Sequence, residues 1–260
     1  SAEDTSPIDL VEEEEDDFEN VDSESILDEC VGAGLLEKTL RWHYRSKDDS
    51  LINFSNKYIY GNKLITFPSS TINSDSVGVS FKFVENGIYD RGGTQTNIKE
   101  ATEIVNKIIN IFNSEENPSL GIVAFNSKQQ RLIMDLLEVE MKKSHSLEEK
   151  INKSTEKLFI KNLETVQGDE RDIIIISICY GKDKNGAMYL NFGPINKKGG
   201  EKRLNVLITR ARKQVIVFSS IRGSDFNLNM SSVNEEKRGA ELLKKYIEYA
   251  ECGGSREKLN

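Results

Sequence analysis

Two arginines that lie two positions apart, Arg210 and Arg212, are well suited to bind a phosphate. They end the run Arg-Leu-Asn-Val-Leu-Ile-Thr-Arg-Ala-Arg at 203–212, and an apolar run at 215–218 follows them. The first run has helical character and the second is typical of a buried strand. A guanidinium stays charged and offers a planar fork of donors, which suits a phosphate better than an ammonium does. The alternative is a surface helix whose last arginines offset the helix dipole.

An aromatic residue beside an arginine forms a second candidate site. Tyr44 and Arg45 belong to the segment Leu-Arg-Trp-His-Tyr-Arg-Ser at 40–46. An aromatic ring can stack on a nucleobase while the arginine binds a phosphate. A core tyrosine next to a solvated arginine is the simpler alternative, and the pair alone does not separate the two.

Two further segments place polar residues next to expected strands. Asn126 and Ser127 follow the apolar run at 121–125 and begin a predicted helix, where free backbone N–H groups favour an anion. Ordinary helix capping is the alternative there. The loop Glu-Thr-Val-Gln-Gly-Asp-Glu-Arg-Asp at 164–172 leads directly into four successive isoleucines. This polar, glycine-bearing loop before a buried strand indicates a binding loop, and a simple charged turn is the alternative.

Together, and in this order, these segments resemble the motifs of superfamily 1 helicases. The matching segments are the family's Tyr-Arg segment at 40–46, motif IV at 121–130, motif V at 164–172 and motif VI at 203–212. The context Phe-Gly-Pro-Ile-Asn at 192–196 is similar to the branch that includes the RNA-surveillance helicases and related bacterial DNA helicases. The resemblance covers residues from about 26 to 250, most of the chain.

The resemblance implies a role for each matching residue. Arg45 and Arg210 would act as catalytic residues at the γ-phosphate of ATP, Tyr44 would stack on the adenine, and Glu170 would bind the ribose hydroxyls. The same nucleotide-binding loop includes Gln167 and Gly168. The residues expected to contact the nucleic-acid backbone are Asn126, Ser127, Thr165 and Arg203.

Two features of a complete helicase motor, the phosphate-binding loop and the magnesium-binding carboxylates, are not found in the sequence. No Gly-x-x-x-x-Gly-Lys-Ser/Thr loop occurs, the run Gly-Gly-Glu-Lys at 199–202 lacks that spacing, and no Asp-Glu pair follows a hydrophobic strand. Phosphoryl transfer needs both the phosphate loop and the magnesium carboxylates. The resemblance therefore implies the second lobe of a longer helicase, a RecA-like α/β domain without its own P-loop. This lobe would be inactive alone, with ATP and Mg²⁺ held mainly by the first lobe.

The charge of the chain is unevenly distributed. The net charge is −8, yet residues 1–29 contain fourteen acidic and no basic residues, so the remainder carries a net charge of +6. Residues 1–25 are predicted to form a flexible acidic linker, and 26–260 the RecA-like lobe. The net positive charge of residues 30–260 is compatible with a nucleic-acid partner. Alternatively, the acidic segment could mimic DNA and cover the positively charged surface formed by residues 30–260.

Composition also bears on location. Cys30, Cys179 and Cys252 are unclustered, which fits a reducing compartment and argues against a disulfide framework. With only two histidines besides, a structural metal site is not expected. No apolar run is long enough to cross a bilayer and no signal peptide is visible, so we expect a cytoplasmic protein without a membrane partner.

Apolar periodicity predicts strands that alternate with helices. Strands are expected at 77–84, 121–125, 158–163, 172–178 and 215–219, and a short strand-to-loop segment at 40–45. Helices are expected at 48–58, 97–112, 127–143 and 234–250, with another between the loop 182–200 and the last strand. The run Asn-Ile-Lys-Glu at 97–100 is typical of a capping box, in which Asn97 and Glu100 each accept from the other's backbone N–H. The isoleucine run, apolar on both faces, predicts a mostly parallel sheet covered on both sides in three layers. Ligand-binding loops are expected at the carboxyl ends of these strands.

The expected function is ATP-driven translocation along nucleic acid. The expected partners are a single strand, with DNA favoured over RNA, and the N-terminal RecA-like lobe of the same protein. One alternative is a nucleic-acid-binding module of the same ancestry without motor activity. Another is a small-molecule α/β enzyme, for which the sequence shows no nucleophile elbow and no paired carboxylates beside a histidine.

Overall fold

The computed structural model describes residues 38–66, 76–226 and 235–255, together with Cys30, Gly34 and Leu36. The acidic segment 1–25 lies outside the described residues, so its role as a linker stays a prediction. The chain divides into two compact units, Ser1–Leu40 and Arg41–Asn260. The fold and the sites below belong to the second unit.

A parallel five-stranded sheet forms the centre of this unit. Its strands are β3 (Gly78–Phe83), β4 (Leu120–Ala124), β5 (Phe159–Asn162), β6 (Arg171–Ser177) and β7 (Ala211–Ser219). They lie in the order β3-β7-β6-β4-β5, and all four pairings are parallel. The predicted α/β class with a parallel sheet is confirmed.

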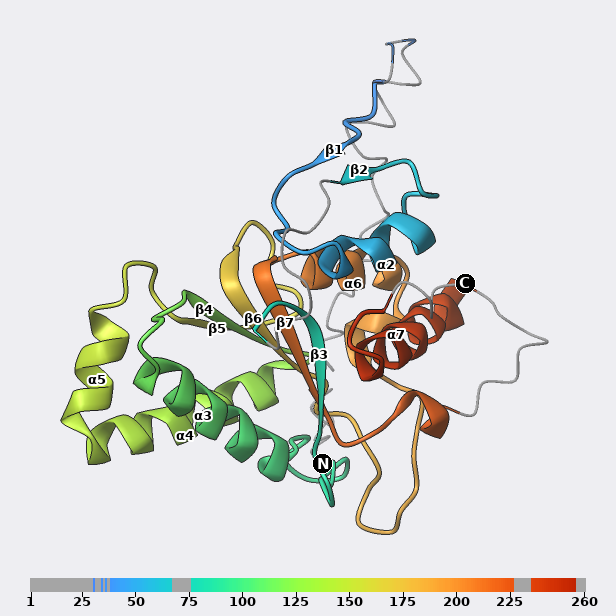
Figure 1. Cartoon of the computed structure of the whole chain (residues 1–260). Coiled ribbons are helices and arrows are strands. Elements are labelled where there is room, and N and C mark those ends of the chain that lie inside the picture. Colours follow the sequence, from blue (N-terminus) through green and yellow to red (C-terminus); the bar gives the residue numbers. More distant parts are fainter. Residues whose placement is uncertain are drawn as a thin grey trace, which may run out of the picture. The chain divides into compact units, whose positions relative to one another are not determined.

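Helices cover both faces of the sheet because successive strand residues point to opposite sides. Ile173 and Ile175 of β6 pack into one apolar cluster, and Ile174 and Ile176 into the other. The first cluster is closed by α3 (Ile98–Asn113), α4 (Ser127–Lys143) and α5 (His145–Asn152), as Figure 1 shows. The second is closed by α2 (Ser50–Tyr58), α6 (Gly200–Ile208) and α7 (Glu235–Glu251). Within the described ranges, no helix is long and apolar enough to span a membrane.

Some short elements were not predicted. Helix α5 has only two buried side chains, Leu147 and Ile151, so its apolar signal is weak. Ser144 ends α4 and its hydroxyl caps α5 by accepting from the Leu147 N–H, which turns the chain between the two helices. By contrast, β1 (Trp42–His43) lies within the expected strand-to-loop segment at 40–45 and pairs in parallel with β2 (Ile65–Thr66). The remaining unpredicted short elements are β2 and the 3₁₀ turns η1 (Gly193–Asn196) and η2 (Gly223–Asp225).

The start of α3 differs from the sequence expectation in one contact. Asn97 caps the helix as predicted, because its side chain accepts from the Glu100 N–H. The second predicted contact, from the Asn97 N–H to the Glu100 side chain, is wrong. The Asn97 N–H instead donates to Oε1 of Gln129 at 2.8 Å. The Glu100 side chain instead turns into the protein, where it accepts from Ser177, the last residue of β6, and from the N–H of Cys179 just beyond the strand.

Candidate nucleotide and nucleic-acid sites

Three predicted site residues meet where the parallel strands begin, here called the amino edge of the sheet. Glu170 directly precedes β6 and Arg210 directly precedes β7. Arg45 reaches both from the segment before α2. Its Nε donates to Oε2 of Glu170 at 2.7 Å, and its Nη1 donates to the Thr209 carbonyl at 3.3 Å. The fold therefore brings together residues that are 125 and 164 positions apart in the chain.

Arg210 is held in place by neutral oxygens. Its Nε donates to the Val206 carbonyl at 2.7 Å and its Nη2 to Oγ1 of Thr209 at 3.3 Å. Burial, and then the positive charge of Arg45, lower the pKa of Arg210. Glu170 acts in the opposite direction but is already paired with Arg45. The Arg210 guanidinium thus lies near the Arg45 guanidinium without a carboxylate partner of its own, and an anion placed between the two would be stabilised.

Arg212 has the opposite environment. Its guanidinium is paired with Glu156, donates to Oδ1 of Asp172 at 3.2 Å and to Oγ of Ser119 at 2.9 Å, and lies 3.5 Å from Oε1 of Glu170. The hydrogen bond to Glu156 is the main cause that raises the pKa of Arg212. The sequence run does not distinguish the two arginines, whereas the fold neutralises Arg212 and leaves Arg210 among neutral partners. Neither Glu156 nor this network was predicted.

The remaining nucleotide-site residues are accessible. Tyr44 is 84% exposed, and Gln167 and Gly168 are exposed in the loop before β6. Gly168 has φ of +92°, a left-handed conformation that favours glycine. The side chain of Glu170 is 41% exposed, and a carboxylate has about four acceptor positions, so it can accept from a ligand while paired with Arg45.

Asn126 and Ser127 lie at the opposite edge, where the strands end, here called the carboxyl edge. Asn126 caps α4 by accepting from the Gln129 N–H at 2.7 Å, as ordinary capping requires. Its Nδ2 also donates to the Gln95 carbonyl and to Sγ of Cys179, both at 3.2 Å. The Asn126 side chain is therefore occupied within the protein, whereas Ser127 is exposed at the start of a seventeen-residue helix.

Thr165 and Arg203 contact their own loops. Oγ1 of Thr165 bonds with Asn162, the last residue of β5, and so lies at the carboxyl edge. Arg203 lies in the first turn of α6, and its Nη1 donates to the carbonyls of Lys198 at 2.8 Å and Pro194 at 3.5 Å. Of the predicted residues, Arg45, Glu170 and Arg210 therefore lie together at the amino edge, and Asn126, Ser127 and Thr165 lie at the carboxyl edge. Arg203 is bonded to neither group.

A buried polar network, of which only the helix cap at Asn97 was predicted, lies beneath the carboxyl edge. Glu100 is fully buried, and its Oε1 accepts from Oγ of Ser177 at 2.6 Å and from the Cys179 N–H at 2.8 Å. Burial raises the pKa of Glu100 to about 8. Cys179 has φ of +54°, so this carboxyl group supports a left-handed residue at the exit of β6. Through Cys179 the network reaches Asn126.

Comparisons with known proteins agree with the motifs. The family described as "AAA domain" matches residues 23–222. The chain is 37% identical over 240 residues to an uncharacterized ATP-dependent helicase of Mycoplasma genitalium, and 35% identical over 239 residues to its homolog in Mycoplasma pneumoniae. Each alignment covers 89% of this chain and 20% of the relative, so the chain spans about a fifth of these curated relatives. The chain therefore belongs to the AAA domain family and carries the C-terminal lobe of a superfamily 1 helicase, which confirms the resemblance seen in its sequence.

Proposed function

We propose that this lobe completes the ATP site of a helicase motor with its amino edge and grips a single strand with its carboxyl edge. The observation that carries the proposal is the convergence of Arg45 and Arg210 on Thr209, where Glu170 pairs with Arg45 and leaves Arg210 without a carboxylate partner. The helicase names of the two relatives support the same assignment. The activity of the longer protein is part of the proposal.

The amino edge fits the polyphosphate end of ATP. Arg45 and Arg210 would hold the terminal phosphate, Glu170 the ribose and the exposed ring of Tyr44 the adenine. ATP, bound with Mg²⁺, supplies the γ-phosphoryl group that is transferred to water. The two guanidiniums are already fixed by hydrogen bonds, so they can offset the developing charge with little reorganisation. The part of the chain that the structure describes contains no cluster of three metal-ligating side chains, so we assign Mg²⁺ mainly to the N-terminal lobe.

The carboxyl edge would hold the backbone of the strand. Ser127 and the first turn of α4 offer hydroxyl and N–H donors, and Thr165 offers a hydroxyl at the end of β5. Contacts of this kind bind phosphates without reading bases. Closure of the two lobes on ATP and reopening after hydrolysis would move these donors along the strand, with DNA favoured over RNA. A cytoplasmic location belongs to the same proposal.

The ATPase activity of the chain tests the proposal when it is measured alone and within the longer protein. The isolated chain should show no nucleic-acid-stimulated turnover, because the phosphate loop and magnesium carboxylates belong to the other lobe. The longer protein should hydrolyse ATP faster when a single strand is added. Robust stimulated turnover by the isolated chain would contradict the half-site assignment. A longer protein that binds strands without hydrolysing ATP would instead support a binding module of helicase ancestry.

A further inference from the structure

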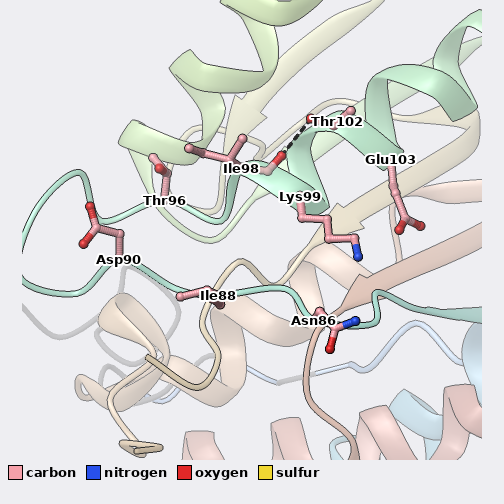
Figure 2. Close-up of a pocket in the computed structure, with 8 residues that line it drawn as sticks. All are labelled: Asn86, Ile88, Asp90, Thr96, Ile98, Lys99, Thr102 and Glu103. Carbon is pink, nitrogen blue, oxygen red and sulfur yellow. Dashed lines mark hydrogen bonds between the residues drawn. The ribbon is translucent and has the colours of Figure 1, made fainter. Parts of the chain in front are cut away.

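A hollow of about 680 Å³ opens where β3 ends and α3 begins. One wall is the loop segment 86–96 and the other is the first turns of α3, as Figure 2 shows. None of the motifs found in the sequence includes this hollow. Its volume lies within the usual range for small-ligand sites in proteins.

Three polar side chains at the hollow are available to a ligand. Asn86, Lys99 and Glu103 make no hydrogen bond or ion pair with the other described residues, and Figure 2 shows their ends gathered around the same space. The neighbouring Asp90 differs, because its carboxylate accepts from the Thr94 N–H at 2.8 Å and from its hydroxyl at 3.1 Å. The hollow thus offers an ammonium donor, a carboxylate acceptor and an amide that can act as both.

Two isoleucines supply an apolar surface beside these groups. Ile88 is 50% exposed and Ile98 is 61% exposed, and both line the hollow. A flat ring laid against them would remove apolar surface from water. An apolar surface with a few converging polar groups is the usual composition of a site for a heterocycle.

The hollow adjoins the proposed strand path. It lies at the carboxyl end of β3, on the edge of the sheet that carries Asn126 and Ser127. Nδ2 of Asn126 donates to the Gln95 carbonyl, and the next residue, Thr96, lines the hollow. A strand held at the start of α4 therefore passes close to this opening.

We propose that the hollow receives one unstacked base of the bound strand, with guanine preferred; this inference rests on the proposed strand path. On one edge guanine carries the O6 acceptor beside the N1–H and N2–H donors. Lys99 would donate to O6, and Glu103 would accept from the two N–H groups, while Ile88 and Ile98 contact the ring. The other bases lack two adjacent N–H donors beside a carbonyl acceptor. The lobe would then combine sequence-neutral backbone contacts with a preference for one base.

Binding of matched single strands to the chain tests this inference. The probes are a labelled twelve-residue oligothymidine, the same strand with one central guanine, and a third with inosine, which lacks the N2 amine. The strand with guanine should bind at least about fivefold tighter than the oligothymidine, and inosine should lose part of that gain. Glu103→Gln should abolish the preference but leave oligothymidine affinity within about twofold. Glu115→Gln, the same change at an exposed residue just beyond α3, should keep the preference.

The outcomes separate the two proposals. Equal affinity of the unaltered chain for all three strands would overturn the base site and leave the strand path intact. Retention of the full guanine preference by Glu103→Gln, in a variant with an unchanged circular dichroism spectrum, would also overturn it. Failure of the unaltered chain to bind any of the strands would overturn the strand path itself.

Discussion

The two edges of the same sheet have different electrostatic designs. At the amino edge three arginines and three carboxylates lie within one network, and one guanidinium, that of Arg210, bonds only to neutral oxygens. At the carboxyl edge the two residues proposed to hold the strand backbone, Ser127 and Thr165, are exposed and neutral, and the carboxyl group of Glu100 beneath this edge is buried. The amino edge therefore has charged side chains at its proposed ATP site, whereas the two residues proposed to hold the strand at the carboxyl edge carry no charge.

Under the proposed function, this difference would correspond to two kinds of phosphate contact. A terminal phosphate that gains charge during transfer is stabilised most by fixed, permanently charged donors. A backbone phosphate that must be released at every step is better held by weaker, neutral donors, whose hydrogen bonds are about half as strong. The amino edge is thus suited to chemistry and the carboxyl edge to repeated binding and release.

Removal of Arg210 or Arg45 should give the largest effect. In the longer protein, Arg210→Ala or Arg45→Ala should lower kcat by about 10³-fold or more, with a smaller change in KM. The reason is that each guanidinium is expected to interact more strongly with the transition state than with bound ATP. Steady-state ATPase kinetics with saturating single strand measure both constants.

Arg238→Ala provides the matched control. Arg238 is exposed on α7, outside both site groups, so kcat should stay near that of the parent. If Arg45→Ala and Arg210→Ala also kept a near-normal kcat, the amino edge would not be the charged half of the ATP site.

Glu100 should make the stability of the fold depend on pH. Burial raises its pKa from 4.5 to about 8, so between these values the folded chain keeps a proton that the unfolded chain releases. The stabilisation is complete below pH 4.5 and is lost as the pH rises toward 8, by roughly a few kcal/mol. Cys179 stays a thiol in this window because burial raises its pKa too.

Urea unfolding at several pH values between 5 and 8 measures this effect. Glu100→Gln keeps an acceptor for Ser177 and the Cys179 N–H but cannot titrate, so its free energy of unfolding should fall less with pH than that of the parent. If the free energy of unfolding changed with pH equally in the parent and in Glu100→Gln, Glu100 would be charged in the folded state. The buried carboxyl group would then not be a neutral support for the carboxyl edge.

Arg212→Ala should act on stability rather than on chemistry. Its guanidinium is paired with Glu156 and Asp172 and is 25% exposed. Its removal leaves Glu156 without this partner, whereas Asp172 keeps Lys213 at 3.1 Å. A loss of about 2 kcal/mol in the free energy of unfolding is expected, below that of a fully buried pair. In the folded fraction kcat should fall far less than in Arg210→Ala. A kcat loss as large as that of Arg210→Ala, with unchanged stability, would reverse the roles of the two arginines.

Much of the fold could be predicted because its signals are local. The five strands follow from short apolar runs, and the long helices α3 and α4 follow from periodicity and from caps at Asn97 and Asn126. Helix α5 was missed since two buried residues give little periodicity. The reciprocal contact at Asn97 was wrong because its N–H binds Gln129, thirty-two positions away, and no local pattern encodes such a partner.

The candidate sites were predictable as segments but not as an arrangement. The motifs named Arg45, Glu170 and Arg210, whereas their meeting at the amino edge depends on strand order, which the sequence does not state. The general expectation of chemistry at the carboxyl ends placed all site residues at one edge, and the structure divides them between two. The buried environments of Glu100 and Arg212 depend on distant residues and could not be read from the chain.

The smallest expected effect concerns the neutral donors of the carboxyl edge. Thr165→Ala should weaken single-strand binding by about two- to fivefold, and equally for unrelated sequences that lack guanine, because a hydroxyl contact to a phosphate carries no base information. The slope of log affinity against log salt should not change, since no charge is removed. By contrast, Arg203→Ala should reduce that slope by roughly one if the guanidinium neutralises a phosphate. Thr165→Ser, which keeps the hydroxyl, is the matched control.

The competing explanation for Thr165 and Arg203 is structural, because Oγ1 of Thr165 already bonds with Asn162 and the Arg203 guanidinium with Lys198 and Pro194. Under that explanation both alanine variants lose stability, yet their folded fractions bind strands with unchanged affinity and slope, a result that would remove both residues from the strand path.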